Sequence, residues 1–179
     1  MALLCAAFGC GSGIEEPPAA PGLADAWRLF EQGRFVEARS AFSNLVSEHG
    51  AAAQEGLGWC ELRMNNLANA DDAFGESKER QDADAGWTFV KWALEEYSAA
   101  IAKADAVLTF SPRYSFAHDT SVNYRDLLLH QAFSYFHLAD FTNCIAKIKL
   151  LDSSFDANPS DPGIETTLLT KLEQLRELI

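Results

Sequence analysis

The chain has 179 residues, 48% of them hydrophobic and 22% charged, which suffices for one domain with a substantial core and excludes disorder throughout. Its 26 acidic and 14 basic side chains give a formal net charge of -12, so a nucleic-acid backbone would be repelled. We therefore expect no nucleic acid as a partner. The negative charge is explained either by a basic peptide or protein partner or by solubility alone.

The chain starts with ten apolar and small residues, MALLCAAFGC, and a Gly-, Ser- and Pro-rich segment follows over residues 11–22. The apolar run is too short to span a bilayer, and it is typical of the end of a signal peptide that leads into a flexible tether. The positively charged start of a signal peptide is missing. We interpret residues 1–10 as the remnant of a signal peptide and residues 11–22 as the tether.

Ala7-Phe8-Gly9-Cys10 resembles the lipobox of bacterial lipoproteins, Leu-x-Gly/Ala-Cys, whose cysteine carries the lipid. Gly9 and Cys10 match, whereas Ala7 stands where Leu is usual and Phe8 is bulky for its place. The resemblance implies lipidation at Cys10, contact with the membrane through this lipid anchor only, and a location in the bacterial cell envelope as an outer membrane lipoprotein that faces the periplasm. If the N-terminus is not processed, the location is cytoplasmic.

Residues 23–152 carry a helical pattern, because apolar residues recur three and four positions apart among Ala, Leu, Glu, Lys and Gln. The pattern repeats: the segment that starts at Trp27 aligns with the one that starts at Trp59, 32 residues later, and two further segments share the frame. Packing positions of this repeat are occupied by Ala38, Phe42, Gly58, Ala70, Phe74, Ala100 and Cys144.

This spacing resembles the tetratricopeptide repeat (TPR), a pair of antiparallel helices that touch through small residues. Phe35, Ala38 and Phe42 look like the aromatic and small positions of the second helix, and Pro112 stands where the closing proline is expected. The resemblance implies an all-α, right-handed solenoid of about four helix pairs. A generic helical bundle with chance periodicity is the alternative.

The repeat is irregular. The offsets between the successive packing residues Ala38, Ala70, Ala100 and Cys144 are 32, 30 and 44 residues. The period of the family is about 34 residues. The last interval contains extra residues around Ser111 to Asn123. These residues either lengthen a helix or form a loop on one face of the solenoid.

The C-terminal part begins with residues 153–163, whose Ser, Asp, Asn, Pro and Gly predict a linker. Residues 164–179 then show helical spacing of the leucines Leu168, Leu169, Leu172, Leu175 and Leu178. We expect this segment to be a capping helix that shields the open end of the stack. A tail helix that binds a partner is the alternative.

Candidate catalytic residues do not form a recognisable motif. Cys60 belongs to no Cys-x-x-Cys pair, and His130 and His137 lie seven positions apart without a third ligand. His118 and Asp119 stand together in the insertion, where the sequence does not reveal a role. The sequence therefore predicts that the protein is not an enzyme, with no catalytic residue, no metal and no cofactor.

A binding groove is better supported. In the TPR family the first helices of successive pairs line a concave groove, so the resemblance implies that a protein or peptide binds there. The candidate groove residues are Trp27, Phe30, Glu31, Trp59, Leu62, Arg63, Phe89 and Trp92. The alternative is that these aromatic side chains pack between helices.

The function that we expect is that of a lipid-anchored, TPR-like scaffold that binds a protein or peptide in the cell envelope. Acidic residues are densest between Asp71 and Glu96, which attracts a basic partner or simply forms a solvated face. A structural subunit of an envelope assembly is one alternative, and a cytosolic adaptor is another if the N-terminus is not processed. Neither the partner nor the oligomeric state follows from the sequence.

Overall fold

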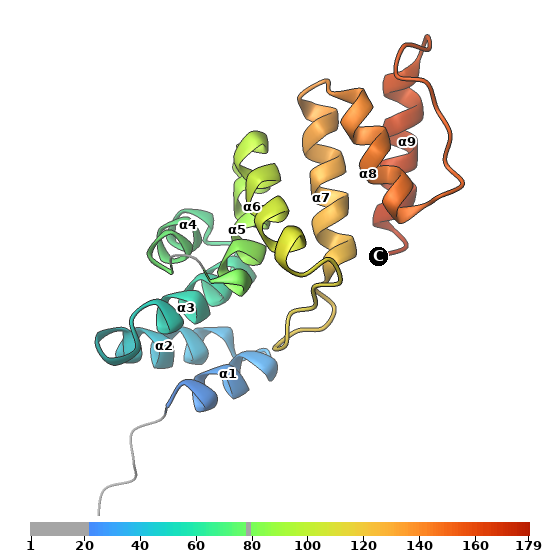
Figure 1. The fold of residues 1–179 in the computed structure, drawn as a ribbon. Helices are drawn as coiled ribbons and strands as arrows, with labels where there is room; N and C mark the ends of the chain where they lie inside the picture. Colours follow the sequence, from blue (N-terminus) through green and yellow to red (C-terminus); the bar gives the residue numbers. More distant parts are fainter. Residues whose placement is uncertain (1–21, 78–79) are drawn as a thin grey trace, which may run out of the picture.

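The computed structural model describes residues 22–77 and 80–179, and there the regular secondary structure is helical apart from one isolated β-bridge (Figure 1). In chain order the helices are α1 (Leu23–Glu31), α2 (Phe35–His49), α3 (Ala51–Arg63), α4 (Leu67–Glu76), α5 (Gln81–Ala93), α6 (Tyr97–Phe110), α7 (Tyr124–His137), α8 (Phe141–Leu151) and α9 (Ile164–Arg176). The first eight form four consecutive pairs, and α9 packs on α7 and α8. The expected all-α helical repeat is confirmed.

The turns within the four pairs share one backbone geometry. In the first, the Gly33 N–H donates to the Phe30 carbonyl at 2.8 Å and the Arg34 N–H donates to the Leu29 carbonyl at 3.0 Å. This is the Schellman arrangement, which needs one residue in the left-handed conformation. Those left-handed residues are Gly33, Asn65, Glu95 and Ala139, and they are spaced by 32, 30 and 44 residues. The backbone therefore follows the same register as the small packing residues of the sequence.

The small residues lie where helices approach each other most closely. Ala38, Ala70 and Cys144 are fully buried, and Ala100 is nearly so. Gly58 of α3 faces the Phe74 ring of α4, so closely that a Cβ at position 58 would lie 2.5 Å from Phe74 Cδ1. Close contact of α3 with α4 therefore requires glycine at position 58.

The C-terminal helix closes the stack. Its residues Leu168, Leu172 and Leu175 are buried with side chains of α7 and α8. The linker before it is held by Lys171, whose Nζ lies 2.6 Å from Asp152 Oδ2. Hydrogen bonds from Lys171 and Ser154 lower the pKa of Asp152 to about 2. The leucines that face the other way, Leu169 and Leu178, are exposed.

Residues 1–21, with the predicted signal-peptide remnant and Cys10, lie outside the described part of the chain. Within residues 22–77 and 80–179, no helix combines the length and the apolar character needed to cross a bilayer.

We predict that Gly58→Ala destabilises the fold by about 1–3 kcal/mol, because the added methyl group overpacks the contact with Phe74 and outweighs the gain in helix propensity. Gly75→Ala in α4 is the matched control, since its Cβ would meet Trp87 at an ordinary 3.7 Å. Urea unfolding followed by circular dichroism measures both. Equal stability of the two variants would contradict the close-packing explanation.

Candidate functional site

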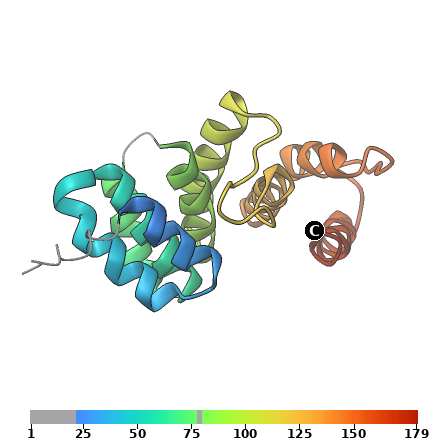
Figure 2. The same ribbon diagram turned by 90° about the horizontal axis from the view of Figure 1, so that it is seen from below.

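The insertion between α6 and α7 is a loop. Residues 111–123 leave α6, fold back along the first helices of the pairs, and reach the end of α1 (Figures 1 and 2). The Phe116 N–H donates to the Val122 carbonyl at 2.9 Å and the Tyr124 N–H donates to the Tyr114 carbonyl at 2.8 Å, so the two ends of the loop pair like a short hairpin. We call residues 111–123 the insertion loop, and the face formed by α1, α3, α5 and α7 the inner face.

Phe116 anchors the insertion loop on the inner face. Its ring stacks on Trp59, with centroids 4.1 Å apart and an interplanar angle of 14°. The edges of Trp27 and Phe30 complete the enclosure at centroid distances of 5.9 and 6.1 Å. Phe116 is fully buried as a result. Aromatic residues of the first two pairs therefore bind a segment of the chain itself.

The next loop residues add polar contacts at the rim. The His118 ring lies parallel to Trp27, with centroids 3.9 Å apart, and its Nδ1 lies 2.7 Å from Glu31 Oε1. Asp119 forms an ion pair with Arg63 of α3. The insertion residues His118 and Asp119 thus connect the loop to the first two helix pairs.

A partly buried polar cluster contacts the start of the insertion loop. The Tyr114 hydroxyl donates to Asp82 Oδ1 at 2.8 Å, and Trp59 Nε1 donates to the Asp82 carbonyl at 3.1 Å. Burial raises the pKa of the Tyr114 phenol above its ordinary value, so the hydroxyl keeps its proton. Burial also raises the pKa of Glu55, opposed by the Arg80 guanidinium whose Nε lies 2.9 Å from Glu55 Oε2.

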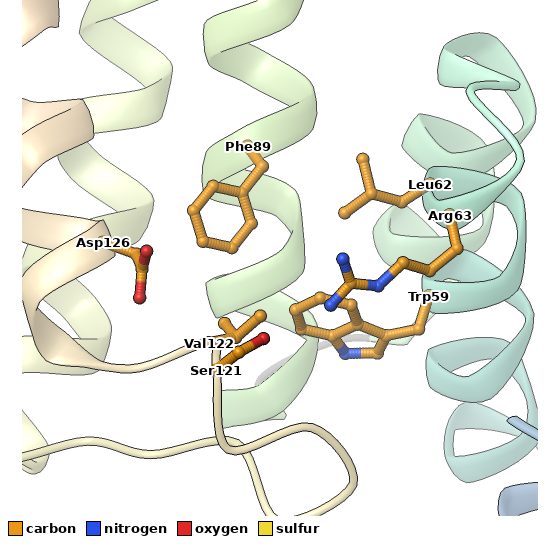
Figure 3. A pocket seen from close by; sticks show the side chains of 7 residues that line it. All are labelled: Trp59, Leu62, Arg63, Phe89, Ser121, Val122 and Asp126. Carbon is orange, nitrogen blue, oxygen red and sulfur yellow. The ribbon is translucent and has the colours of Figure 1, made fainter. Parts of the chain in front are cut away.

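Beside the loop, the inner face keeps an open pocket of about 370 Å³, which we call the inner pocket (Figure 3). Helices α3, α5 and α7 and the end of the insertion loop supply its lining, which consists of Trp59, Leu62, Arg63, Phe89, Ser121, Val122 and Asp126. Its volume falls in the range typical of ligand pockets. The insertion loop therefore covers one part of the inner face and forms a wall of what remains.

The two charged side chains of the inner pocket differ in their partners. Arg63 is already paired with Asp119, whereas Asp126 lies on the opposite side of the pocket and accepts a 2.8 Å hydrogen bond from the Asn123 N–H (Figure 3). Among the residues that the structure describes, no ion pair involves Asp126. The charge available to a ligand in this pocket is therefore negative.

Beyond the pocket, the inner face is packed. His130 meets Phe89 and Trp92 edge-on, with ring centroids 4.7 and 5.1 Å away, and its Nδ1 lies 2.8 Å from the Asp126 carbonyl. Burial lowers the pKa of His130 below its ordinary value, which keeps the ring neutral at pH 7. Trp92 also packs against Phe133.

The candidate groove residues thus fall into three groups. Trp27, Phe30 and Glu31 lie against the insertion loop, Trp59, Leu62, Arg63 and Phe89 line the inner pocket, and Trp92 of the third pair packs against the fourth pair. Sequence reasoning did not identify Phe116 or Asp126 as part of this face. An aromatic residue inside a breaker-rich insertion was the available signal for Phe116. No signal distinguished Asp126 from other acidic residues at helix starts.

Other reactive side chains do not gather into a site. Cys60 and Cys144 are fully buried, and burial raises the pKa of each thiol to about 12. His137 stacks on Tyr97 with centroids 4.5 Å apart. In the described ranges 22–77 and 80–179, no three His, Cys, Asp or Glu side chains are placed to hold a metal ion.

A crystal structure of a tetratricopeptide repeat protein from Parabacteroides merdae ATCC 43184 is similar to this chain, with a TM-score of 0.57 and 13% sequence identity. The match covers 87% of this chain and 59% of the other, so this chain spans well under two thirds of that protein's length. No sequence-family model and no curated protein matches the chain. The likeness shows a TPR-like fold and leaves the function and the partner open.

We predict that Phe116→Ala destabilises the protein by about 3–5 kcal/mol, because loss of the buried ring leaves an enclosed cavity and removes the stacking partner of Trp59. Chemical unfolding measures the loss, and the intrinsic fluorescence of the tryptophans is expected to shift to longer wavelength as Trp59 meets water. Thr120→Ala, at an exposed position of the same loop, is the control. If Phe116→Ala were as stable as this control, the loop would not be anchored on the inner face.

Proposed function

We propose that this protein is a non-catalytic scaffold that holds a segment of a partner protein on its inner face. The observation that supports this function best is the inner pocket, whose floor is formed by Trp59, Leu62 and Phe89. These side chains come from two consecutive pairs, so a segment that runs along the inner face meets them in succession. A large apolar side chain of the partner fills the pocket beside the insertion loop.

The proposed partner is basic next to this apolar residue. Asp126 supplies a negative charge in the pocket without a cation to neutralise it among the described residues, whereas Arg63 is paired with Asp119. The net charge of -12 attracts a basic segment from a distance and accelerates its approach. This attraction weakens as the salt concentration rises.

The proposed location is the bacterial cell envelope, with the lipid on Cys10. Gly9 and Cys10 after an apolar run support this proposal, and the Pro-rich residues that follow would serve as a spacer between the membrane and the solenoid. One acylated cysteine places a protein on a membrane rather than through it.

We predict that Phe89→Ala weakens binding of a basic peptide about tenfold or more, because a buried aromatic contact carries much of the affinity of such a site. The probes are fluorescein-labelled dodecapeptides with one Phe or Leu between Lys and Arg residues, and fluorescence anisotropy measures the affinity. Asp126→Asn is expected to reduce the preference for basic over neutral peptides while leaving the apolar requirement unchanged.

The matched control is Val36→Ser, an exposed position of α2 that is 63% accessible and lies outside the pocket. It is expected to bind the basic peptides like the unmodified protein. Loss of binding in all three variants, or basic peptides that bind no better than neutral ones, would argue against the inner pocket as the peptide site.

We predict that the protein, expressed from its full upstream reading frame in a bacterial host, is acylated at Cys10 and sediments with membranes. Mass spectrometry of the mature N-terminus measures the modification. Cys10→Ala is expected to abolish it, and Cys5→Ala is the control that retains it. An unmodified N-terminus that keeps residues 1–10 would refute the envelope location and leave a cytosolic binding module.

A further inference from the structure

A second pocket lies on the other side of the insertion, where the loop joins α6 to α7. Its volume is about 350 Å³, and residues of α6, the insertion loop, α7 and α8 line it. We call it the outer pocket. Its main lining residues are Leu108, Arg113, Tyr124, Leu128, Lys147 and Leu150. None of these residues lines the inner pocket.

The outer pocket offers an apolar surface that the fold leaves uncovered. Leu128 is buried, Leu108 is half-buried, and Leu150 exposes 65% of its surface. Together with the Tyr124 ring, these three leucines form an apolar surface against which one large apolar side chain can pack. Burial of such a side chain favours binding.

The charges at the rim of the outer pocket are positive. The Arg113 guanidinium lies over the Tyr124 ring, 5.1 Å from its centroid, and donates to the Tyr124 hydroxyl at 2.9 Å. These contacts hold the guanidinium in place without neutralising it, and among the described residues it forms no ion pair. Lys147 is already paired with Asp105, whose Oδ1 lies 3.4 Å from the Lys147 Nζ, so Arg113 is the rim cation without a carboxylate partner among the described residues. No carboxylate belongs to the lining itself.

This local sign is opposite to that of the whole molecule, which carries 26 acidic against 14 basic side chains. An extended polyanion such as a nucleic acid would meet the acidic surroundings as well as the two cations, and a flat anionic membrane would do the same. A short acidic segment can reach Arg113, which no carboxylate of the described residues pairs. The charge pattern therefore selects a local and specific anionic group.

We infer that the outer pocket binds an acidic segment of a partner protein. The segment places a large apolar side chain against Leu108, Leu128 and Leu150, and an adjacent Asp or Glu carboxylate on Arg113, with Lys147 at the rim. Arg113 is preorganised by Tyr124, so less side-chain freedom is lost when the carboxylate binds. This inference goes beyond the proposed function, because it assigns a second site of opposite charge preference on another face.

The consequence is a scaffold with two ligands. The inner pocket prefers a basic segment and the outer pocket an acidic one, and the insertion loop and the start of α7 separate them. Two sites of opposite sign do not compete for the same segment. The protein can therefore connect two different partners, or two segments of one partner.

The test uses the full chain and a fluorescein-labelled dodecapeptide with one Leu or Phe between Asp and Glu residues. Its charge-reversed counterpart carries Lys and Arg instead. Fluorescence anisotropy measures the affinity for both peptides. We expect the double variant Arg113→Glu, Lys147→Glu to weaken the acidic peptide about tenfold or more and to leave the basic peptide unaffected or slightly tighter.

Lys149→Glu is the matched control. It makes the same charge change as Lys147→Glu on the same helix, α8. Lys149, however, pairs with Asp156 and does not line the pocket. It is expected to affect the acidic peptide by less than about threefold, the size of a rim-charge effect. Leu150→Ser, at an exposed position that folding does not require, is expected to weaken the acidic peptide without a change of charge.

Three results would overturn the inference. The first is that, in the Phe89→Ala variant, the acidic peptide binds no more tightly than the charge-reversed peptide. The second is that Lys149→Glu weakens the acidic peptide as much as the double variant does. The third is that Leu150→Ser binds the acidic peptide with unchanged affinity. Thermal unfolding of each variant checks that the fold is kept. Failure here leaves the inner pocket untouched, because Phe89→Ala and Asp126→Asn report on that site separately.

Discussion

Phe116 stacks on Trp59 with the ring centroids 4.1 Å apart, and this contact joins a loop between the third and fourth pairs to the second pair. In a solenoid each repeat normally contacts only its neighbours. Here the insertion loop also reaches Trp27 in the first pair. The loop therefore fixes the curvature of the inner face, because a change of angle between the pairs would break the stack. The shape of the inner pocket depends on the same contact.

Much of the helical framework could be predicted from the sequence because its determinants are local. Small residues at Ala38, Ala70, Ala100 and Cys144 recur at offsets of 32, 30 and 44, and the left-handed turn residues have the same offsets. Gly33 and Asn65 are residue types that favour the left-handed conformation, whereas Glu95 and Ala139 are not, so composition alone would have missed two of the four turns. The recurrence of apolar and small residues predicted the repeat itself, because packing between helices sets the register.

The path of the insertion loop could not be predicted, because it depends on contacts between residues far apart in the sequence. Asp119 is separated from Arg63 by 56 positions, and His118 from Glu31 by 87. No periodicity connects Asp119 with Arg63 or His118 with Glu31. The sequence placed the aromatic residues of the first helices on one face, and did not reveal that a segment of the chain covers part of it. Trp27 consequently packs in the core instead of lining a free groove, whereas Trp59 both packs on the loop and borders the inner pocket.

The distribution of charge decides which residues can recognise a partner. Several carboxylates of the acidic stretch between Asp71 and Glu96 are paired within the fold: Lys91 lies 2.8 Å from Asp71 and Lys103 lies 2.9 Å from Asp84. These carboxylates contribute to the field around the molecule and are not free to select a ligand group. A partner is therefore recognised by single charged side chains beside the apolar lining of a pocket, where removal from water strengthens an ion pair. In the two binding modes that we propose, Asp126 in the inner pocket and Arg113 in the outer one are these charges.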